Sequence, residues 1–242
     1  MAQTTDHKIS STTIARGATI ALSVALGVFA APDAHAQDTG LYGFGFGGFT
    51  FNGQQDGDGN LAGAPNSVDT DYDDDFQLGF GVGRKFSKLS SDKIGVRGEI
   101  ELSYGESDAD EIRFSGNNTP TEINVGGGIE ATTLFANIYA DFETGGALTP
   151  FVGAGVGVGR FSQDLIYGPG VQVSESDTAF GLQLIAGAAY EVSDKLTLTA
   201  DARYREFYDI ESNRFDPTGA STGVVSGDFS AVSINFGARI AF

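Results

Sequence analysis

Residues 233–242 read SINFGARIAF and end the sequence on a strictly alternating pattern. The even positions are apolar: Ile234, Phe236, Ala238, Ile240 and Phe242. The odd positions are polar or small: Ser233, Asn235, Gly237, Arg239 and Ala241. Alternation with a period of two indicates a β-strand with one apolar face. Because terminal residues are usually polar and frayed, an apolar, aromatic last residue indicates that this face lies against an apolar medium.

The same alternation recurs along the chain, with turn-forming residues between the runs. It predicts eight strands, at about 41–52, 76–86, 93–104, 129–142, 149–161, 179–190, 195–207 and 229–242. In KIGVRGEIELSY (93–104), Ile100 and Leu102 share one face while Glu99 and Glu101 share the other. With 35 glycines in 242 residues, the composition also favours tightly packed strands and turns over long helices.

The predicted connections alternate in length. Three are short turns, SKLSSD, ETGGAL and EVSD, whereas residues 53–75, 105–128, 162–178 and 208–228 are long. In an antiparallel meander every second connection lies at the same end, so all long loops meet at one end and both termini at the other. This asymmetry is typical of bacterial outer-membrane barrels.

Aromatic residues fall near both ends of the predicted strands, in phase with their apolar faces. The short-turn end has Tyr42, Phe86, Phe142, Tyr190 and Phe242, and the long-loop end has Phe76, Tyr104, Phe180 and Tyr204. Two aromatic belts that flank an aliphatic band match two membrane–water interfaces. Phe151 does not fit this phase. Since an open sheet edge is unfavourable in hydrocarbon, we predict an all-β, eight-stranded antiparallel up-and-down transmembrane barrel, whose lumen is narrow enough for side chains to fill.

The first 36 residues have the pattern of a secretory signal peptide. Lys8 and Arg16 precede an apolar run at 17–31, and Ala34-His35-Ala36 is a small-x-small cleavage site. We therefore expect a cleaved leader at 1–36 and a barrel domain at 37–242. The apolar run is too short for a spanning helix.

Four segments carry a family resemblance: LFANIYADF (134–142), PFVGAGVGVGRF (150–161), FGLQLIAGAAY (180–190) and TLTADARYREF (197–207). They resemble the small eight-stranded outer-membrane barrels of Gram-negative bacteria, the OmpA/OmpX-like and opacity-type porin family. The resemblance covers residues 41–242 and implies a monomeric barrel in the outer membrane, with periplasmic termini and extracellular long loops. It also implies that the terminal aromatic, Phe242, is part of the signal read by the outer-membrane assembly machinery.

Charged residues on the inward faces predict an ion-pair network in the lumen. Its members are Arg97, Glu99, Glu101, Asp201, Arg203, Arg205 and Arg239, with Asn137 and Gln183 on the same inward-facing set. The third and seventh strands lie opposite each other in a ring of eight, so Glu99 and Glu101 are expected to face Asp201, Arg203 and Arg205. Such a network can be a structural plug that compensates buried charges, or a narrow ion pathway that the pairs gate.

The net charge of −18 lies in the long connections: taken as 52–75, 105–127, 162–178 and 206–228, they hold 20 acidic residues and two bases, Arg113 and Arg214. The densest run has Asp69, Asp71, Asp73, Asp74 and Asp75. We expect a solvated, partly disordered loop. The sharper hypothesis is weak binding of Ca²⁺ or Mg²⁺, which would bridge the loops to lipopolysaccharide phosphates. An acidic surface disfavours nucleic acid.

Both histidines, His7 and His35, lie in the expected leader, and the chain has no cysteine. A mature chain without either residue excludes Ser-His hydrolysis and His- or Cys-ligated metal sites, so we predict no enzyme and no tightly bound cofactor. The leading hypothesis is a surface-presentation scaffold for adhesion, envelope integrity, or contact with ions or lipopolysaccharide. The alternatives are a narrow pore for ions or small solutes and a soluble secreted β-protein.

Overall fold

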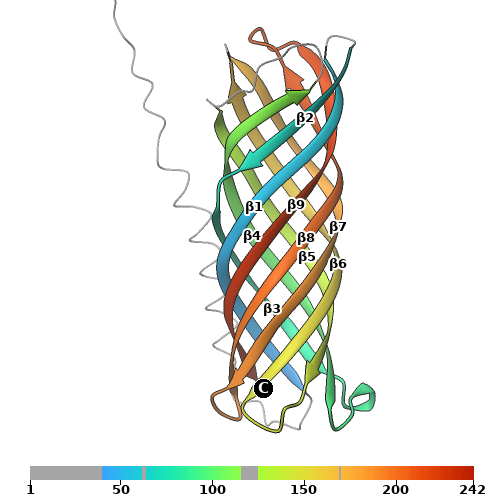
Figure 1. Ribbon diagram of the computed structural model, residues 1–242, viewed down its shortest axis with the longest axis vertical. Coiled ribbons are helices and arrows are strands. Elements are labelled where there is room, and N and C mark those ends of the chain that lie inside the picture. The colour runs from blue at the N-terminus through green and yellow to red at the C-terminus, as the bar shows by residue number, and fades with distance from the viewer. Residues whose placement is uncertain (1–39, 62–63, 116–124, 169) are drawn as a thin grey trace, which may run out of the picture.

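The computed structural model describes residues 40–61, 64–115, 125–168 and 170–242. Their strands form one closed sheet, drawn in Figure 1 as a tall barrel. The strands are β1 (Leu41–Leu61), β2 (Ala64–Tyr72), β3 (Asp75–Lys85), β4 (Ile94–Ser115), β5 (Gly126–Phe142), β6 (Leu148–Tyr167), β7 (Val171–Glu191), β8 (Leu196–Phe215) and β9 (Ser221–Ala241). A short 3₁₀ helix, η1 (Ser87–Leu89), lies in the first turn. Among the described residues, no helix is long and apolar enough to cross a membrane.

Strands that are neighbours in the ring pair antiparallel, and β1 pairs with β9 to close it. The strands β2 and β3 occupy one position in the wall, because both lie between β1 and β4: β2 pairs with the upper part of each, and β3 with the lower part. Only Asp73 and Asp74 interrupt this position. The wall is therefore an eight-stranded up-and-down barrel, as the sequence predicts.

The predicted loops are largely wrong, because the strands continue into them. Of the expected loop 53–75, β1 takes the first part and β2 most of the second. The other long connections likewise shorten as β4, β6, β7, β8 and β9 extend. The barrel consequently has a lower part with an apolar exterior and an upper extension of the same sheet.

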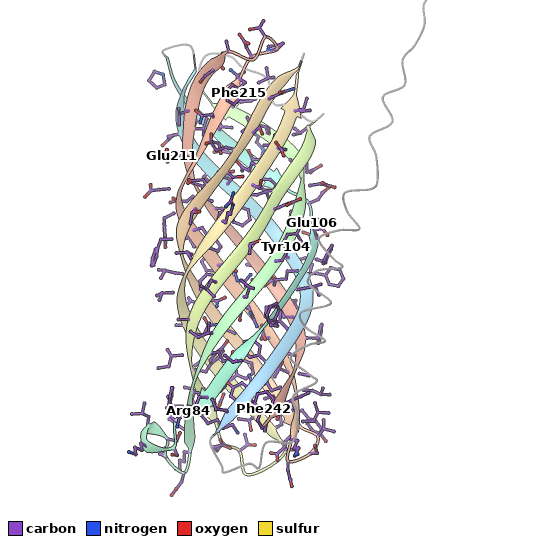
Figure 2. All side chains as sticks on the ribbon, turned by 180° about the vertical axis from the view of Figure 1, so that it is seen from behind. Arg84, Tyr104, Glu106, Glu211, Phe215 and Phe242 are labelled. Atoms are coloured by element: carbon purple, nitrogen blue, oxygen red, sulfur yellow. The ribbon has the colours of Figure 1, made fainter. Side chains whose placement is uncertain are left out.

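Side chains alternate across the wall. On β4, Ile100 and Leu102 are 52% and 38% exposed on the outside, whereas Glu101 between them is fully buried inside. The apolar exterior runs from Ile94 to Tyr104, which at about 3.3 Å per residue and a tilt of about 40° makes a band about 25 Å tall. Glu106 is the first outward charge beyond it, and Figure 2 shows Tyr104 and Glu106 well below Glu211 and Phe215 at the upper end.

One member of the predicted aromatic belts is misplaced. Tyr42 is 4% exposed and points into the lumen with Phe44 and Phe46. The outward positions between them are Gly43, Gly45 and Gly47, so β1 reverses the usual arrangement. The reason is packing: the lumen needs large rings here, as shown below. Tyr190, Phe180 and Phe242 do face outward, at 53%, 52% and 40% exposure.

The connections separate as expected. Those at 86–93, 143–147 and 192–195 lie at the end where Phe242 donates its backbone N–H to Leu41 O at 3.2 Å. Figure 2 shows Arg84 and Phe242 together at this lower end. The last residues of β1, β4, β6 and β8 lie at the other end (Figure 1). The expected leader, residues 1–36, lies outside the described residues.

Candidate functional site in the barrel lumen

The middle of the lumen is closed by a carboxylate that bridges two arginines. Glu101 of β4 accepts hydrogen bonds from Arg203 Nη1 at 2.7 Å and Arg205 Nη2 at 2.9 Å, both on β8. Arg203 also donates through Nε to Asp201 at 2.7 Å. All four side chains are at least nine-tenths buried. We name Glu101, Asp201, Arg203 and Arg205 the middle layer.

Side-chain amides complete the hydrogen bonds of the middle layer. Arg205 donates to Gln183 at 3.1 Å and to Gln77 at 2.8 Å. Gln77 donates in turn to Asn235 at 2.6 Å, and Asn235 donates to Asp201 at 3.1 Å. Because each of these polar groups has a partner inside the barrel, the cost of removing the charges from water is partly offset.

A second charged cluster lies nearer the short-turn end. Arg97 pairs with Glu99 and, through Nε, with Asp141 at 2.9 Å. Arg239 Nε lies 3.7 Å from the same Glu99 carboxylate, which also accepts a 2.7 Å hydrogen bond from Tyr42. We name Arg97, Glu99, Asp141 and Arg239 the lower layer.

Aromatic rings hold the arginines of both layers. The Arg97 guanidinium carbon lies 3.5 Å from the centroid of Tyr139 and 5.0 Å from that of Phe151. Arg203 lies 4.0 Å from the Phe46 ring. A guanidinium stacked on a ring face gains a cation–π attraction that is stronger away from water. This explains why Phe46 and Phe151 point inward although both are fully apolar.

The structure places all seven residues of the predicted lumen network inside the barrel, but it divides them into two layers. The expected contact of Glu99 with Arg203 and Arg205 is wrong: Glu99 contacts Arg97 of its own strand, and Arg239. Glu101 alone bridges to β8. Sequence reasoning missed Asp141, Tyr139, Gln77 and Asn235. The alternation of the strands could have placed these residues inside the barrel, since Asp141 lies four residues from Asn137 on one strand. The tyrosine and amide side chains, however, carry no charge that would have marked them as members of an ion-pair network.

Above the middle layer the lumen is filled by an aromatic cluster. Phe161 packs against Phe207 with ring centroids 4.7 Å apart, and Phe207 also contacts Phe135 at 5.7 Å. These three side chains are at most 2% exposed. Phe229 joins Phe161 at 5.7 Å. We name Phe135, Phe161, Phe207 and Phe229 the aromatic plug.

A polar cluster closes the lumen above the aromatic plug. Gln163 donates to Gln55 and, at 2.7 Å, to the hydroxyl of Tyr72. Ser212 donates to Gln163 at 2.6 Å. Val68, Ile112 and Leu165 line a cavity of about 50 Å³ above it.

Each charged layer contains two arginines and two carboxylates, so each is neutral overall. Three cavities along the described part of the lumen have separate linings: about 150 Å³ at the short-turn end beside Arg239, about 50 Å³ between Arg205 and the aromatic plug, and about 50 Å³ in the upper extension. Such an arrangement can hold compensated charges inside the lumen without leaving an open path along it.

The predicted acidic loop is wrong as a loop. Asp69 and Asp71 lie on the outer face of β2, and Asp75 begins β3. Asp71 pairs with Arg113 of β4, while Asp69 lies directly opposite Asp56 of β1. Only Asp73 and Asp74 lie in a connection. Within the described part of the chain, no group of three or more acidic residues converges as a metal-ion site.

A comparison with known proteins agrees with this barrel architecture. The family model for the outer membrane protein β-barrel domain matches residues 21–241. The chain belongs to this family. It is therefore a bacterial outer-membrane barrel protein.

Individual relatives of this outer-membrane barrel are distant. Outer membrane protein PagN of Salmonella typhimurium strain LT2 is 28% identical over 169 residues, which are 66% of this chain and 70% of PagN. The crystal structure of OprG from Pseudomonas aeruginosa superposes with a TM-score of 0.57 at 16% identity, over 87% of this chain and all of OprG. The outer membrane protease OmpT from Escherichia coli superposes with a TM-score of 0.52 at 7% identity, over 87% of this chain and 99% of OmpT. Since both structures are under 25% identical, they show the barrel fold alone.

Proposed function

We propose that this outer-membrane barrel is a closed scaffold that holds an acidic, sheet-built extension outside the cell. The observation that carries the proposal is the filled lumen. Two neutral charged layers, the aromatic plug and the polar cluster of Gln163 follow one another along the axis. A lumen filled in this way favours a structural plug over a pathway.

The upper extension supports the presentation part of the proposal. Its outer face carries exposed carboxylates on four strands: Asp56 and Asp58 of β1, Asp108 of β4, Asp164 of β6 and Asp228 of β9. Its interior holds the polar cluster of Gln163 together with apolar side chains, among them Ile112, Leu165 and Ile210 at 4% exposure or less. A filled interior makes the extension a folded part of the barrel, so its acidic face has a fixed shape that a partner can recognise.

The proposed orientation puts Leu41 and Phe242 on the periplasmic side. The apolar band lies nearer this end, and the acidic extension on the other side of the band would then project from the cell. Phe242 would lie at the periplasmic interface, where the assembly machinery reads the last strand. We expect the protein to act as a monomer without a cofactor, and to bind Ca²⁺ or Mg²⁺ only loosely through its outer carboxylates.

A catalytic role is not part of the proposal. Residues 37–242 contain neither histidine nor cysteine, which removes the usual base and nucleophile of hydrolytic sites. The four carboxylates of the two lumen layers are buried and paired with arginines.

The test combines conductance with topology. In planar bilayers the wild-type barrel should show no steady ion conductance, and Glu101→Ala should not create one while the aromatic plug remains. Steady single-channel currents that change with Glu101→Ala would instead establish the narrow pore.

For topology, an epitope tag between Thr218 and Gly219, in the connection after β8, should be detected on intact cells. The matched control is a tag between Gly145 and Gly146, in the turn after β5, where a Cβ added at Gly145 would meet no atom beyond its chain neighbours within 4 Å. It should be detected only after permeabilisation. The reverse result would contradict the orientation.

A further inference from the structure

The exterior of β6 carries an isolated arginine at the boundary of the apolar band. Arg160 is exposed, and its partners across the ladders are Thr132 of β5 and Thr178 of β7, both exposed. Towards the short-turn end the next outward residue is Val158, which is 46% exposed. In the other direction it is Ser162. Arg160 is therefore the first polar residue above the apolar band on the exterior of this strand, at the level of the outer-leaflet headgroups.

On the upper exterior, Arg160 forms no ion pair within 4 Å with any residue that the structure describes. Arg113, the other exposed arginine on the upper exterior, pairs with Asp71 and Glu111. Arg214 donates to Thr222. Four arginines are in the lumen layers, and the remaining described bases, Arg84, Lys85, Lys88, Lys93 and Lys195, lie at the short-turn end. A guanidinium flanked by two hydroxyls, on an otherwise acidic exterior, is complementary to an anion such as a phosphate.

A groove lies on the same side of the barrel, within the apolar band. Its volume is about 590 Å³, and it crosses the exterior of β5, β6, β7 and β8. The small residues Ala136, Ala154 and Gly155 form its floor, between larger side chains that include Ile138, Val156, Leu182, Leu184 and Tyr204. Ile138, Val156 and Leu184 are 57%, 53% and 61% exposed, so they stand above the floor as its walls.

The groove and Arg160 are close enough for one ligand. Val156, at the groove, is four residues from Arg160 along β6, which corresponds to about 13 Å at about 3.3 Å per residue. An apolar groove inside the membrane band meets acyl chains, and a base at the edge of the band meets headgroups. A lipid with a phosphate and several acyl chains satisfies both features.

We propose that the exterior of β5–β8 binds one phosphorylated lipid of the outer leaflet. Arg160, with Thr132 and Thr178, binds a headgroup phosphate, and an acyl chain lies in the groove over Ala136 and Ala154. This inference rests on the proposed orientation, in which Arg160 faces the outer leaflet. It deepens the proposed function by giving the acidic scaffold a fixed lipid partner at its boundary.

The test uses the full mature barrel, refolded in detergent with bisphosphorylated lipid A as the probe and examined by native mass spectrometry. Arg160→Gln should lower lipid retention about tenfold, as expected from the loss of a charge-assisted hydrogen bond. Ala154→Leu, which fills the groove, should lower it several-fold. The matched control is Arg84→Gln, an exposed arginine at the other end of the barrel, and it should leave retention unchanged.

Further arms separate the sources of binding. Lipid A without phosphates should lose the effect of Arg160→Gln but keep that of Ala154→Leu, and inorganic phosphate alone should not compete at millimolar concentration. Retention unchanged in Arg160→Gln, or lowered equally by Arg84→Gln, would overturn the proposal. So would a dimer that Ala154→Leu dissociates without any lipid bound, because the groove would then be a protein interface.

Folding is checked by heat-modifiable migration on a gel, and Ala136→Val replaces Ala154→Leu if the latter does not fold. The tag and conductance experiments do not involve Arg160. A failure of the lipid site would therefore leave the proposed function standing, whereas reversed tags would overturn both.

Discussion

Glu101 on β4 accepts hydrogen bonds from both Arg203 and Arg205 on β8, at 2.7 and 2.9 Å. A single carboxylate thus connects opposite walls of the barrel. Removing it would leave two buried guanidinium groups with Asp201 as their remaining carboxylate partner, whereas the wild type balances two charges against two.

Glu101→Gln should therefore destabilise the barrel strongly, by about 3–5 kcal/mol, as when one partner of a buried ion pair is removed. The measurement is urea unfolding of the protein in lipid vesicles, followed by circular dichroism because the chain has no tryptophan. Glu191→Gln, an exposed carboxylate at the end of β7, is the matched control and should be nearly neutral. A loss below about 1 kcal/mol for Glu101→Gln would show that the bridge is not a structural element.

The tight packing of the aromatic plug predicts that adding one methyl group beside it destabilises the barrel. A Cβ added at Gly181 would lie 2.5 Å from Phe207 Cδ1, and Phe207 is held in place by Phe161 and Phe135. Gly181→Ala should cost about 1–3 kcal/mol through overpacking. At Gly105, also on an inward position, the nearest atom would be 3.4 Å away, so Gly105→Ala should cost clearly less. Equal unfolding free energies for the two variants would contradict the packing account.

The ladder between β7 and β8 is interrupted in the upper extension, between Val173 and Phe180. There the Asp177 carboxylate accepts the backbone N–H of Glu211 at 2.8 Å, and Glu175 accepts that of Asn213 at 3.1 Å. Asp177→Ala should raise the exchange rate of the Glu211 amide by about tenfold or more, because a hydrogen bond to a charged group is lost.

Hydrogen exchange of the refolded barrel measures this effect. The matched control is Ser174→Ala on the outer face of the same strand, which should leave the Glu211 amide unchanged. Exchange that stays slow in Asp177→Ala would mean that another group closes the interruption.

Two opposed carboxylates predict a pH dependence in the upper extension. Burial, and then the neighbouring Asp56, raise the pKa of Asp69 above its usual 3.8. A raised pKa in the folded state means that the charged form is disfavoured there, so the β1–β2 hairpin should become more stable as the pH falls through that raised pKa towards 3.8.

NMR titration and hydrogen exchange of the hairpin amides check this prediction. Asp56→Asn should lower the pKa of Asp69 and remove part of the pH dependence, with a gain of about 0.2–1 kcal/mol at neutral pH. Asp164→Asn, which changes an exposed carboxylate on β6 outside this hairpin, should change neither quantity. A hairpin that loses protection on mild acidification would contradict the sign.

Phe242 predicts a difference between assembly and stability. Its side chain is 40% exposed, so its deletion should change the unfolding free energy of refolded barrel only slightly. The level in the outer membrane of cells should nevertheless fall severalfold, if the assembly machinery reads this residue. Phe86→Ala, which removes a 36% exposed aromatic at the same end, is the control. Outer-membrane levels that fall equally in both variants would assign the effect to lipid contact.

The sequence pattern was sufficient for the barrel because the membrane imposes it. Along β4 and β8, apolar residues alternate with charges throughout the band, and only one arrangement puts Ile100 outside and Glu101 inside. The eight positions of the ring and the three short turns at one end followed directly, whereas the lengths of the long connections did not.

The upper extension could not be predicted in the same way. The segment QQDGDGN (54–60) has low strand propensity and no apolar face, so it resembles a loop. It is nevertheless paired to β2 and β9 in continuous register, because the neighbouring strands supply hydrogen bonds beyond the membrane. The inward position of Tyr42 also depends on contacts with other strands. Which rings point into the lumen depends on which arginines need a stacking partner.

The lumen residues were predictable individually but not in their pairing. Opposite strands were expected to exchange all their charges, and Glu101 does reach Arg203. Glu99, two residues further along β4, is nearer to Arg239 of β9, since tilted strands place successive inward residues opposite different neighbours. Pairing in a barrel thus depends on shear, which alternation does not reveal.

The position shared by β2 and β3 also constrains how the family can change its length. Tyr72 and Thr70 are buried in the lumen, with Asp69 and Asp71 on the outer face. Inserting one residue before this segment would shift its pairing with the neighbouring strands by one position. The two faces would then be exchanged, and the carboxylates of Asp69 and Asp71 would point into the lumen. Viable natural variants of the extension should therefore differ here by two residues or by none, and a genetic selection from a library of insertions would recover even lengths.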